Sequence, residues 1–193
     1  MYFLKDNKET AKYVYFGDDL LFEINGSDQI MRWYITPSLD QNLMRVEGSD
    51  YSAGNRYYYF QDGLGSVSEI RNASTVQNVY RYNAFGETYY SSESIFNRIK
   101  YTSRTQDRTE SGGQAERYDY RNRLYFPGQA RFSQVDPVFG ANLYKYVGNN
   151  PVRYKDSLGM YVLEWYESFY PIPNKIYLVI FTSKSKISCA ATK

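Results

Sequence analysis

Two aspartates and one arginine are the residues of this chain whose types and spacing are best suited to chemistry. Asp136 and Asp156 lie in the segment QVDPVFGANLYKYVGNNPVRYKDSLGM at residues 134–160, and Arg123 precedes Asp136 by thirteen residues. Two carboxylates brought together across a returning strand pair would share one proton, because like charges in close contact cannot both ionise easily. One would activate water and the other would protonate a carbonyl or a leaving amine, while Arg123 would hold a carboxylate ionised or steady an oxyanion.

A structural interpretation of Asp156 is open beside the chemical one, because this residue begins the turn-like pattern DSLG that ends at Gly159. The same pattern occurs twice upstream, as DGLG from Asp62 to Gly65 and as NAFG from Asn83 to Gly86. Asp or Asn at the first position of such a turn bonds its own backbone, and Gly at the fourth accepts a positive φ. Asn83 indicates that the turn accepts an amide, so the turn explains the position of Asp156 and not its charge.

The neighbours of the pair also have structural interpretations. Asp136 precedes Pro137, a step that favours an extended residue entering a turn, and Arg123 would equally suit an ordinary surface ion pair. A tight turn is predicted at Asn149, Asn150 and Pro151, between the strand-like runs NLYKYV and VRY. The chemical hypothesis therefore depends on whether the fold brings the three charged residues together.

The composition excludes most other catalytic machinery. Histidine is absent from the 193 residues, which excludes Ser-His-Asp and Cys-His nucleophiles and histidine metal sites. The single cysteine, Cys189, excludes an internal disulfide and a thiolate metal cluster. No Gly-rich phosphate loop accompanies the aromatic residues. Neither a cofactor nor a metal is therefore expected, and carboxylate, lysine, tyrosine and arginine remain for acid-base work.

Charge and hydropathy exclude further classes of partner. The net charge of +2 predicts no general affinity for nucleic acid, although residues 98–131 carry eight Lys/Arg against four Asp/Glu. The longest apolar run, Ile176 to Phe181, is far too short to span a bilayer. No signal peptide is expected, since no basic and apolar N-terminal segment precedes a small-residue cleavage site.

Tyrosine-rich runs separated by turn signals predict a β architecture. The chain has 23 tyrosines and 19% aromatic residues, and tyrosine favours strands in which the ring is buried and the hydroxyl finds a partner. Helical periodicity is limited to one short candidate, SESIFNRI at 92–99. The predicted strands are AKYVYF, LLFEI, QIMRWYI, NRYYYFQ, SVSEI and VQNVYRY, each followed by a turn signal.

One internal repeat and two changes of composition organise the chain. Tyr59, Asp62 and Gly65 match Tyr80, Asn83 and Gly86 at a displacement of 21 residues, which indicates stacked β units. Residues 105–116 are polar and are expected to form a surface loop or insertion. Beyond Gly159 the turn pattern stops, so we place a boundary at about residue 160, with a core at 1–160 and a variable tail at 161–193.

The segments YYYFQDGLGSVSEI, YRYNAFGE, YDYRNRLYFPGQARFSQVDP and NLYKYVGNNPVRYKDSLG together resemble the RHS repeat-associated core domain of bacterial Rhs proteins, over about residues 10–160. The chain is similar to the C component of insecticidal toxin complexes. The resemblance implies a strip of YD-repeat β-hairpins that spirals into a shell around a C-terminal cargo polypeptide. At 193 residues the chain looks like a fragment of such a shell.

The resemblance also implies an aspartyl autoprotease that cuts after the last motif of the core. The family's arginine and two aspartates fall on Arg123, Asp136 and Asp156, so the expected cut lies between Met160 and Tyr161. Ser157 and Met160 stand where Pro and Leu are usual in the family. We therefore keep two functions open: a polymorphic-toxin core that releases its C-terminal polypeptide by self-cleavage, and a non-catalytic surface or interaction fragment that has lost processing.

The partners and location implied by the resemblance follow from the shell. They are an upstream YD-repeat shell, the chain's own C-terminal cargo polypeptide and an immunity protein. The assembly is expected to be secreted or held at the cell surface.

Overall fold

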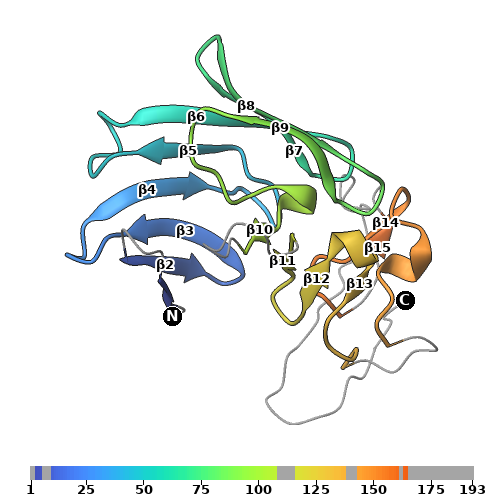
Figure 1. Cartoon of the computed structure of the whole chain (residues 1–193). Coiled ribbons are helices and arrows are strands. Elements are labelled where there is room, and N and C mark those ends of the chain that lie inside the picture. Colours follow the sequence, from blue (N-terminus) through green and yellow to red (C-terminus); the bar gives the residue numbers. More distant parts are fainter. Residues whose placement is uncertain (1–2, 6–9, 108–115, 138–142, 161–162, 165–193) are drawn as a thin grey trace, which may run out of the picture.

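A computed structural model describes residues 3–5, 10–107, 116–137, 143–160 and 163–164, which form antiparallel β-sheets (Figure 1). In the largest sheet each strand pairs with the next in sequence. Its strands are β1 (Phe3–Lys5), β2 (Thr10–Phe16), β3 (Asp19–Ile24), β4 (Ile30–Ile35), β5 (Met44–Glu47), β6 (Asn55–Gln61), β7 (Val67–Asn72), β8 (Thr75–Tyr82) and β9 (Thr88–Glu93). The predicted all-β hairpin strip is confirmed.

Shorter elements follow the large sheet, and Figure 1 shows them in yellow-green to orange. One small sheet contains β10 (Thr105–Gln106), β11 (Tyr118–Asp119), β12 (Leu124–Phe126) and β13 (Arg131–Phe132), and another pairs β14 (Tyr154–Lys155) with β15 (Leu163–Glu164). Three single-turn 3-10 helices lie between them, η1 (Tyr101–Ser103), η2 (Pro127–Gln129) and η3 (Val147–Asn149). Among the described residues, no helix is long and apolar enough to cross a membrane.

Strand β6 illustrates why these sequences form a half-buried sheet. Tyr57 and Tyr59 are buried, while Tyr58 and Phe60 between and after them are exposed on the other face. Successive side chains of a strand point to opposite faces, so alternation of this kind buries one face only. The 21-residue repeat corresponds to one hairpin, because β6–β7 and β8–β9 are consecutive hairpins.

The one short helical candidate, at 92–99, does not form a helix. Strand β9 runs to Glu93, and the chain then continues irregularly across the sheet. The buried side chain of Asn78 accepts hydrogen bonds from the amides of Ser94 and Ile95 at 2.9 and 3.1 Å and donates one to the Ile95 carbonyl at 2.8 Å. These tertiary bonds satisfy the backbone groups that a helix would otherwise pair internally.

Two other expectations along the chain need correction or qualification. Within the predicted loop at 105–116, Thr105 and Gln106 form strand β10, and residues 108–115 lie outside the described part. Strands β5 and β9 were not predicted, because β5 has only four residues and because the apolar residues of β9 do not alternate with polar ones. Of the predicted tail at 161–193, only residues 163–164 are described, and they pair with Tyr154 and Lys155.

Two aromatic cores hold the described residues together. The first lies against the large sheet and includes Tyr34, Tyr59 and Tyr80. The second is formed by the short elements and consists of Tyr101, Tyr118, Tyr120, Tyr125, Phe132, Tyr146 and Val147. Tyr82 of strand β8 packs against both cores. The short elements are thus fixed to the large sheet mainly by tyrosine packing.

The predicted Asn-Asn-Pro turn lies next to η3. Asn149 ends this helix with a positive φ of 61°, and the carbonyl of Asn150 accepts hydrogen bonds from the amides of Arg153 and Tyr154 at 3.2 and 3.1 Å. Pro151 is buried within the turn that follows. This turn directs the chain into strand β14 and so toward Asp156.

Candidate functional site

Four turns of the structure share one hydrogen-bond pattern, and Asp156 begins the last of them. In each, the side-chain oxygen of the first residue accepts hydrogen bonds from the amides two and four residues later. These are Ser27 and Gln29 for Asn25, Leu64 and Ser66 for Asp62, Phe85 and Glu87 for Asn83, and Leu158 and Met160 for Asp156, at 2.8–3.2 Å. The first turn follows a predicted strand and its turn signal, and it departs from the four-residue pattern because Asp28 with φ 60° stands in place of glycine.

The fold brings Arg123, Asp136 and Asp156 together. Nη2 of Arg123 lies 3.0 Å from Oδ2 of Asp136 and 3.3 Å from Oδ2 of Asp156. The two carboxylate oxygens are therefore no further apart than the sum of these distances. The side chains of Arg123 and Asp156 are each 2% exposed, and that of Asp136 is 19% exposed. Asp136 is thus the member of the trio that water reaches most easily.

The guanidinium of Arg123 is held on all sides. Its Nε donates to the carbonyl of Gly159, and its Nη1 donates to that of Leu143 at 3.3 Å. Its central carbon lies 3.6 Å from the centroid of the Phe132 ring, a stacked cation–π arrangement. Phe132 is itself buried in the second aromatic core. The sequence carries no signal for this contact between Phe132 and Arg123.

A backbone hydrogen bond across the loop that joins Asp136 to Leu143 positions Asp136. Its amide donates to the Leu143 carbonyl at 2.8 Å, so this carbonyl accepts from both Asp136 and Arg123. Residues 138–142 between them lie outside the described part. A shared backbone acceptor therefore fixes the carboxylate of Asp136 beside the arginine.

The turn from Asp156 to Met160 lies directly against the β11–β12 connection. Gly159 has φ +68°, and a Cβ added there would lie 2.5 Å from the carbonyl oxygen of Tyr120. Only glycine permits this approach. The amide of Met160 binds Oδ1 of Asp156, so the residue before the predicted cut is attached to the site, whereas Tyr161 lies outside the described residues.

The arrangement can perform limited acid-base chemistry. Oδ1 of Asp156 is occupied by two amides and its Oδ2 by Arg123. The side chain of Asp136 also pairs with Arg123 but is more exposed, so it is the carboxylate that water reaches more easily. The two carboxylates meet through a shared cation, and the shared proton inferred from the sequence stays a prediction. No group of metal-ligand side chains is found among the described residues.

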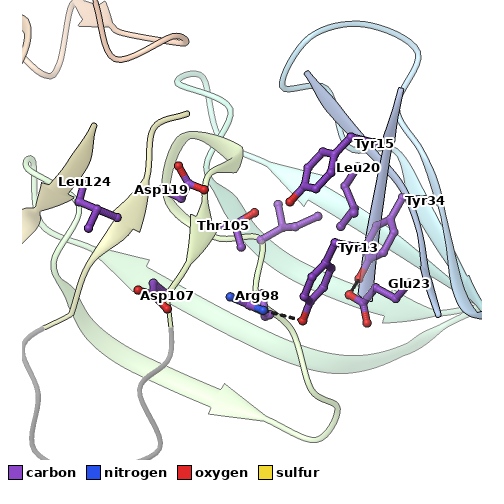
Figure 2. Close-up of a pocket in the computed structure, with 11 residues that line it drawn as sticks. Tyr13, Tyr15, Leu20, Glu23, Tyr34, Arg98, Thr105, Asp107, Asp119 and Leu124 are labelled. Atoms are coloured by element: carbon purple, nitrogen blue, oxygen red, sulfur yellow. Dashed lines mark hydrogen bonds between the residues drawn. The ribbon is translucent and has the colours of Figure 1, made fainter. Parts of the chain in front are cut away.

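A cavity of about 210 Å³ lies elsewhere, between strands β2–β4 and the chain near Arg98 (Figure 2). Its charged groups have partners: Arg98 donates to the hydroxyl of Tyr13 at 2.5 Å, Glu23 pairs with Arg32 at 2.7 Å, and Asp107 pairs with Arg117 at 2.7 Å. None of the three predicted site residues lines it. The arginine-centred trio is therefore the better candidate site.

Comparison with known sequences shows local similarity to one toxin subunit and to one salivary gland surface protein. No protein-family model matches it. Toxin subunit YenC2 of Yersinia entomophaga is 36% identical over 76 residues, which are 38% of this chain and 7% of that protein. Salivary gland surface protein 1 of Aedes aegypti is 34% identical over 110 residues, which are 54% of this chain and 3% of that protein. The chain thus spans less than a tenth of either relative.

Solved structures share the fold. The crystal structure of TcdB2-TccC3-TEV matches 82% of this chain and 8% of that chain, with a TM-score of 0.61 and 21% identity. The structure of TcdB2-TccC3 without its hypervariable C-terminal region matches 79% of this chain and 8% of that chain, with a TM-score of 0.58 and 20% identity. The fold is therefore shared with a toxin-complex structure, and part of the sequence is similar to a toxin subunit. The specific repeat-associated core stays a prediction.

Proposed function

We propose that this chain is part of a toxin-complex-type β-shell, and that its arginine-centred site cuts the chain's own peptide bond between Met160 and Tyr161. One observation carries the proposal. Arg123 contacts both aspartates and also the carbonyl of Gly159, one residue before the bond. Because Arg123 binds the backbone next to the bond that is cut, the reaction needs no separate substrate-binding pocket.

The reaction would be hydrolysis within one molecule. Asp136 takes a proton from water as the oxygen adds to the Met160 carbonyl carbon. The C–N bond then breaks as the nitrogen of Tyr161 takes that proton from Asp136, which returns to its carboxylate form. The new carboxyl group of Met160 passes its own proton to the new amine, so the products are a carboxylate and an ammonium group. Arg123 offsets the negative charge that develops nearby. Because the bond is tethered beside the carboxylates, its effective concentration is high and a single turnover suffices.

The role of the cut would be to free a C-terminal polypeptide enclosed by a larger shell. The match to TcdB2-TccC3 persists where the hypervariable C-terminal region is absent, which supports placing residues 10–160 in the constant part. The upstream YD-repeat shell, the released polypeptide and an immunity protein are the proposed partners. Such an assembly would act in a secreted form or at the cell surface.

A second function is favoured by one feature of the geometry. Both oxygens of Asp156 are engaged, one by its turn and one by Arg123. A trio with these contacts would also serve as a non-catalytic clip that fastens the end of a shell wall. In that case the three charged side chains would contribute to the stability of the fold and would have no catalytic role.

Intact-mass measurement of freshly purified chain separates the two functions. Self-cleavage predicts two fragments, residues 1–160 and 161–193, whose masses sum to that of the uncut chain plus one water. Asp136→Asn should leave the chain uncut, because it removes the base and preserves the shape of the side chain. Asp62→Asn is the matched control in an exposed turn and should cut like the wild type. An uncut wild type rejects self-cleavage and favours the clip.

A further inference from the structure

We propose that three consecutive side chains, those of Arg121, Asn122 and Arg123, form a clamp that reads the backbone of residues 157–159 and thereby sets which peptide bond is cut. The catalytic consequence rests on the proposed function, whereas the clamp itself does not. Arg121 and Asn122 are positioning residues in this proposal, because they hold the substrate segment without reaching the reacting bond.

The clamp is a set of matched hydrogen bonds with a constant offset. Arg121 Nη1 donates to the carbonyl of Ser157, Asn122 Nδ2 to that of Leu158 at 2.8 Å, and Arg123 Nε to that of Gly159. Each donor lies 36 residues before its acceptor. Three successive donors on three successive carbonyls fix the register of the two segments, and a slip by one residue would break every bond.

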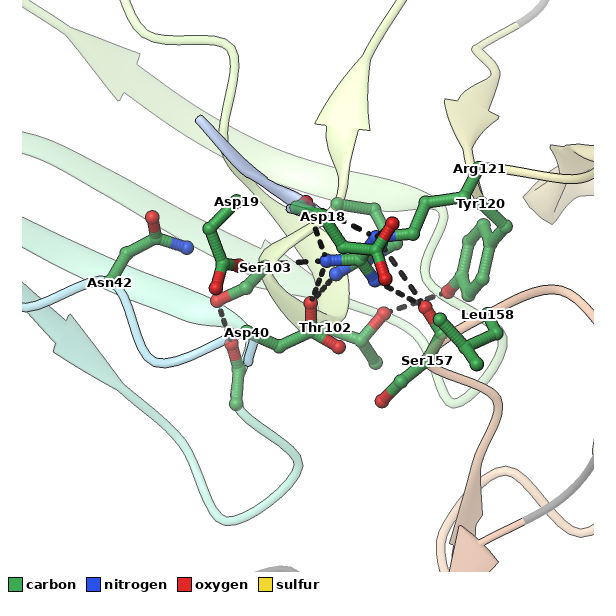
Figure 3. Close-up of polar contacts among 12 residues, drawn as sticks. Asp18, Asp19, Asp40, Asn42, Thr102, Ser103, Tyr120, Arg121, Ser157 and Leu158 are labelled. Carbon is green, nitrogen blue, oxygen red and sulfur yellow. Dashed lines mark hydrogen bonds and ion pairs between the residues drawn. The ribbon is translucent and has the colours of Figure 1, made fainter. Parts of the chain in front are cut away.

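The clamp is anchored to the large sheet through Arg121, as Figure 3 shows. Its Nη2 lies 3.0 Å from Oδ1 of Asp40, in the β4–β5 loop, and its Nε and Nη2 donate to the carbonyl of Asp18 at 3.2 and 3.0 Å. Arg104 joins the same group by pairing with Asp40 and donating to the Ser157 carbonyl at 3.3 Å. Two loops of the large sheet, those that contain Asp18 and Asp40, therefore fix the position of Arg121 and, through it, of the turn that begins at Asp156.

The charge arrangement in this network favours a positioning role. The side chains of Arg104 and Asp40 are 5% and 3% exposed. Burial and the charge of Arg121 lower the pKa of Arg104 to about 10. Two cations facing one buried carboxylate are costly to place, and apolar side chains often pack such a site more stably. The arrangement instead fixes the position of the Ser157 carbonyl, because both arginines donate hydrogen bonds to it.

The clamp recognises main-chain oxygens, which every residue type provides. The position of the cut would then depend on how residues 157–159 are aligned with residues 121–123. It would not depend on which side chains occupy positions 157 and 158. This accounts for the proposed cut after a motif in which serine occupies the second position of the turn. The close approach at Gly159 is the one side-chain requirement, since a Cβ there would meet Tyr120.

Amide hydrogen exchange tests the clamp without any cleavage. The measurement uses the full chain carrying Asp136→Asn, and compares added Asn122→Asp and Arg121→Gln with the control Asn55→Asp. Asn122 is exposed, so its isosteric replacement preserves folding while removing the donor. Exchange of the Leu158 and Met160 amides should be on the order of tenfold faster in both clamp variants and unchanged in the control. Unchanged exchange in the clamp variants overturns the clamp.

The consequence for cutting is tested in chains that retain Asp136. Asn122→Asp and Arg121→Gln should slow the cut on the order of tenfold or produce additional fragment ends, and Arg121→Lys should restore part of the rate. Leu158→Ala should change neither the position nor the rate, because the hydrogen bond from Asn122 goes to the main-chain carbonyl of residue 158. Cutting at the wild-type rate and position in both clamp variants overturns the positioning role. If the wild type stays uncut, the proposed function fails and the exchange result still decides on the clamp.

Discussion

The turns at Asp62 and Asp156 have the same local structure and different surroundings. Both aspartates accept two amides through Oδ1. Asp62 is exposed at the rim of the large sheet, whereas Asp156 is 3% exposed and contacts Arg123 through Oδ2. The turn itself therefore uses only one carboxylate oxygen at each position. The second oxygen of Asp156 has a charged partner because the fold brings Arg123 to it.

The same contrast separates the two regions that carry these turns. In the large sheet, strands of up to eight residues pair with their sequence neighbours. In the short-strand region, strands of two or three residues are fixed by a packed tyrosine cluster and by arginines that bind distant carbonyls. The first region is determined by local pattern and the second by long-range contacts.

The largest expected effect is alkaline unfolding, which should affect both regions together. Burial raises the pKa of Tyr34 and Tyr59 in the large sheet and of Tyr118 and Tyr146 in the second core above the ordinary value of 10.0. The unfolded chain releases these phenolic protons near pH 10 and the folded chain does not, so stability is retained below that pH and lost above it. Tyrosinate absorbance and circular dichroism should change in one transition. Gradual ionisation with the β signal retained would contradict this.

The next effect should distinguish the regions. Arg123→Met removes the cation from buried Asp156 and should lower the free energy of unfolding by about 3–5 kcal/mol. Arg71→Met is the matched change in the large sheet, where Arg71 is 39% exposed and pairs with Glu69. This control should cost about 0–1 kcal/mol. Urea unfolding measures the free energy of unfolding of both variants, after intact mass has shown that each chain is uncut. Equal decreases in the two variants would contradict the distinction between the regions.

The smallest effect concerns the glycines that end the two turns. Gly65→Ala places a Cβ with its nearest contact at 3.9 Å and φ at +85°, so the cost should be the ordinary left-handed penalty of about 1–2 kcal/mol. Gly159→Ala carries the same penalty and also a backbone contact at 2.5 Å, so it should cost about 1 kcal/mol or more beyond Gly65→Ala. Thermal unfolding of the two variants gives the comparison. A smaller loss for Gly159→Ala would indicate that the turn is not held against Tyr120.

The sequence predicted more of the large sheet than of the site that lies beyond it. Alternating tyrosines and Asp-x-x-Gly or Asn-x-x-Gly turns located six strands and the repeat, because strand pairing between neighbours leaves a local pattern. The turn at Asn25 lacks the four-residue pattern although a turn signal follows the strand there, since Asp28 adopts the glycine conformation. The helical candidate at 92–99 does not form a helix, because the buried Asn78 side chain, distant in sequence, satisfies that backbone.

For the site, residue types and a family resemblance identified Arg123, Asp136 and Asp156 as a group, and the fold places them in contact. Their chemical roles stay predictions. Phe132 beneath the guanidinium and the donors Arg121 and Asn122 carried no comparable signal. A side chain that binds a main-chain carbonyl places no demand on the partner's residue type, so no motif records the pairing.

Residue types and their order were enough to predict the β character of this protein and the positions of its sharp turns, and to exclude catalysis that depends on histidine. Those properties follow from residue types and from contacts between neighbours in the chain. Only the tertiary structure decided that the carboxylate of Asp156 is buried against Arg123 while that of Asp62 faces water. Burial and charge pairing depend on segments more than thirty residues apart, and the chain must be folded before either exists.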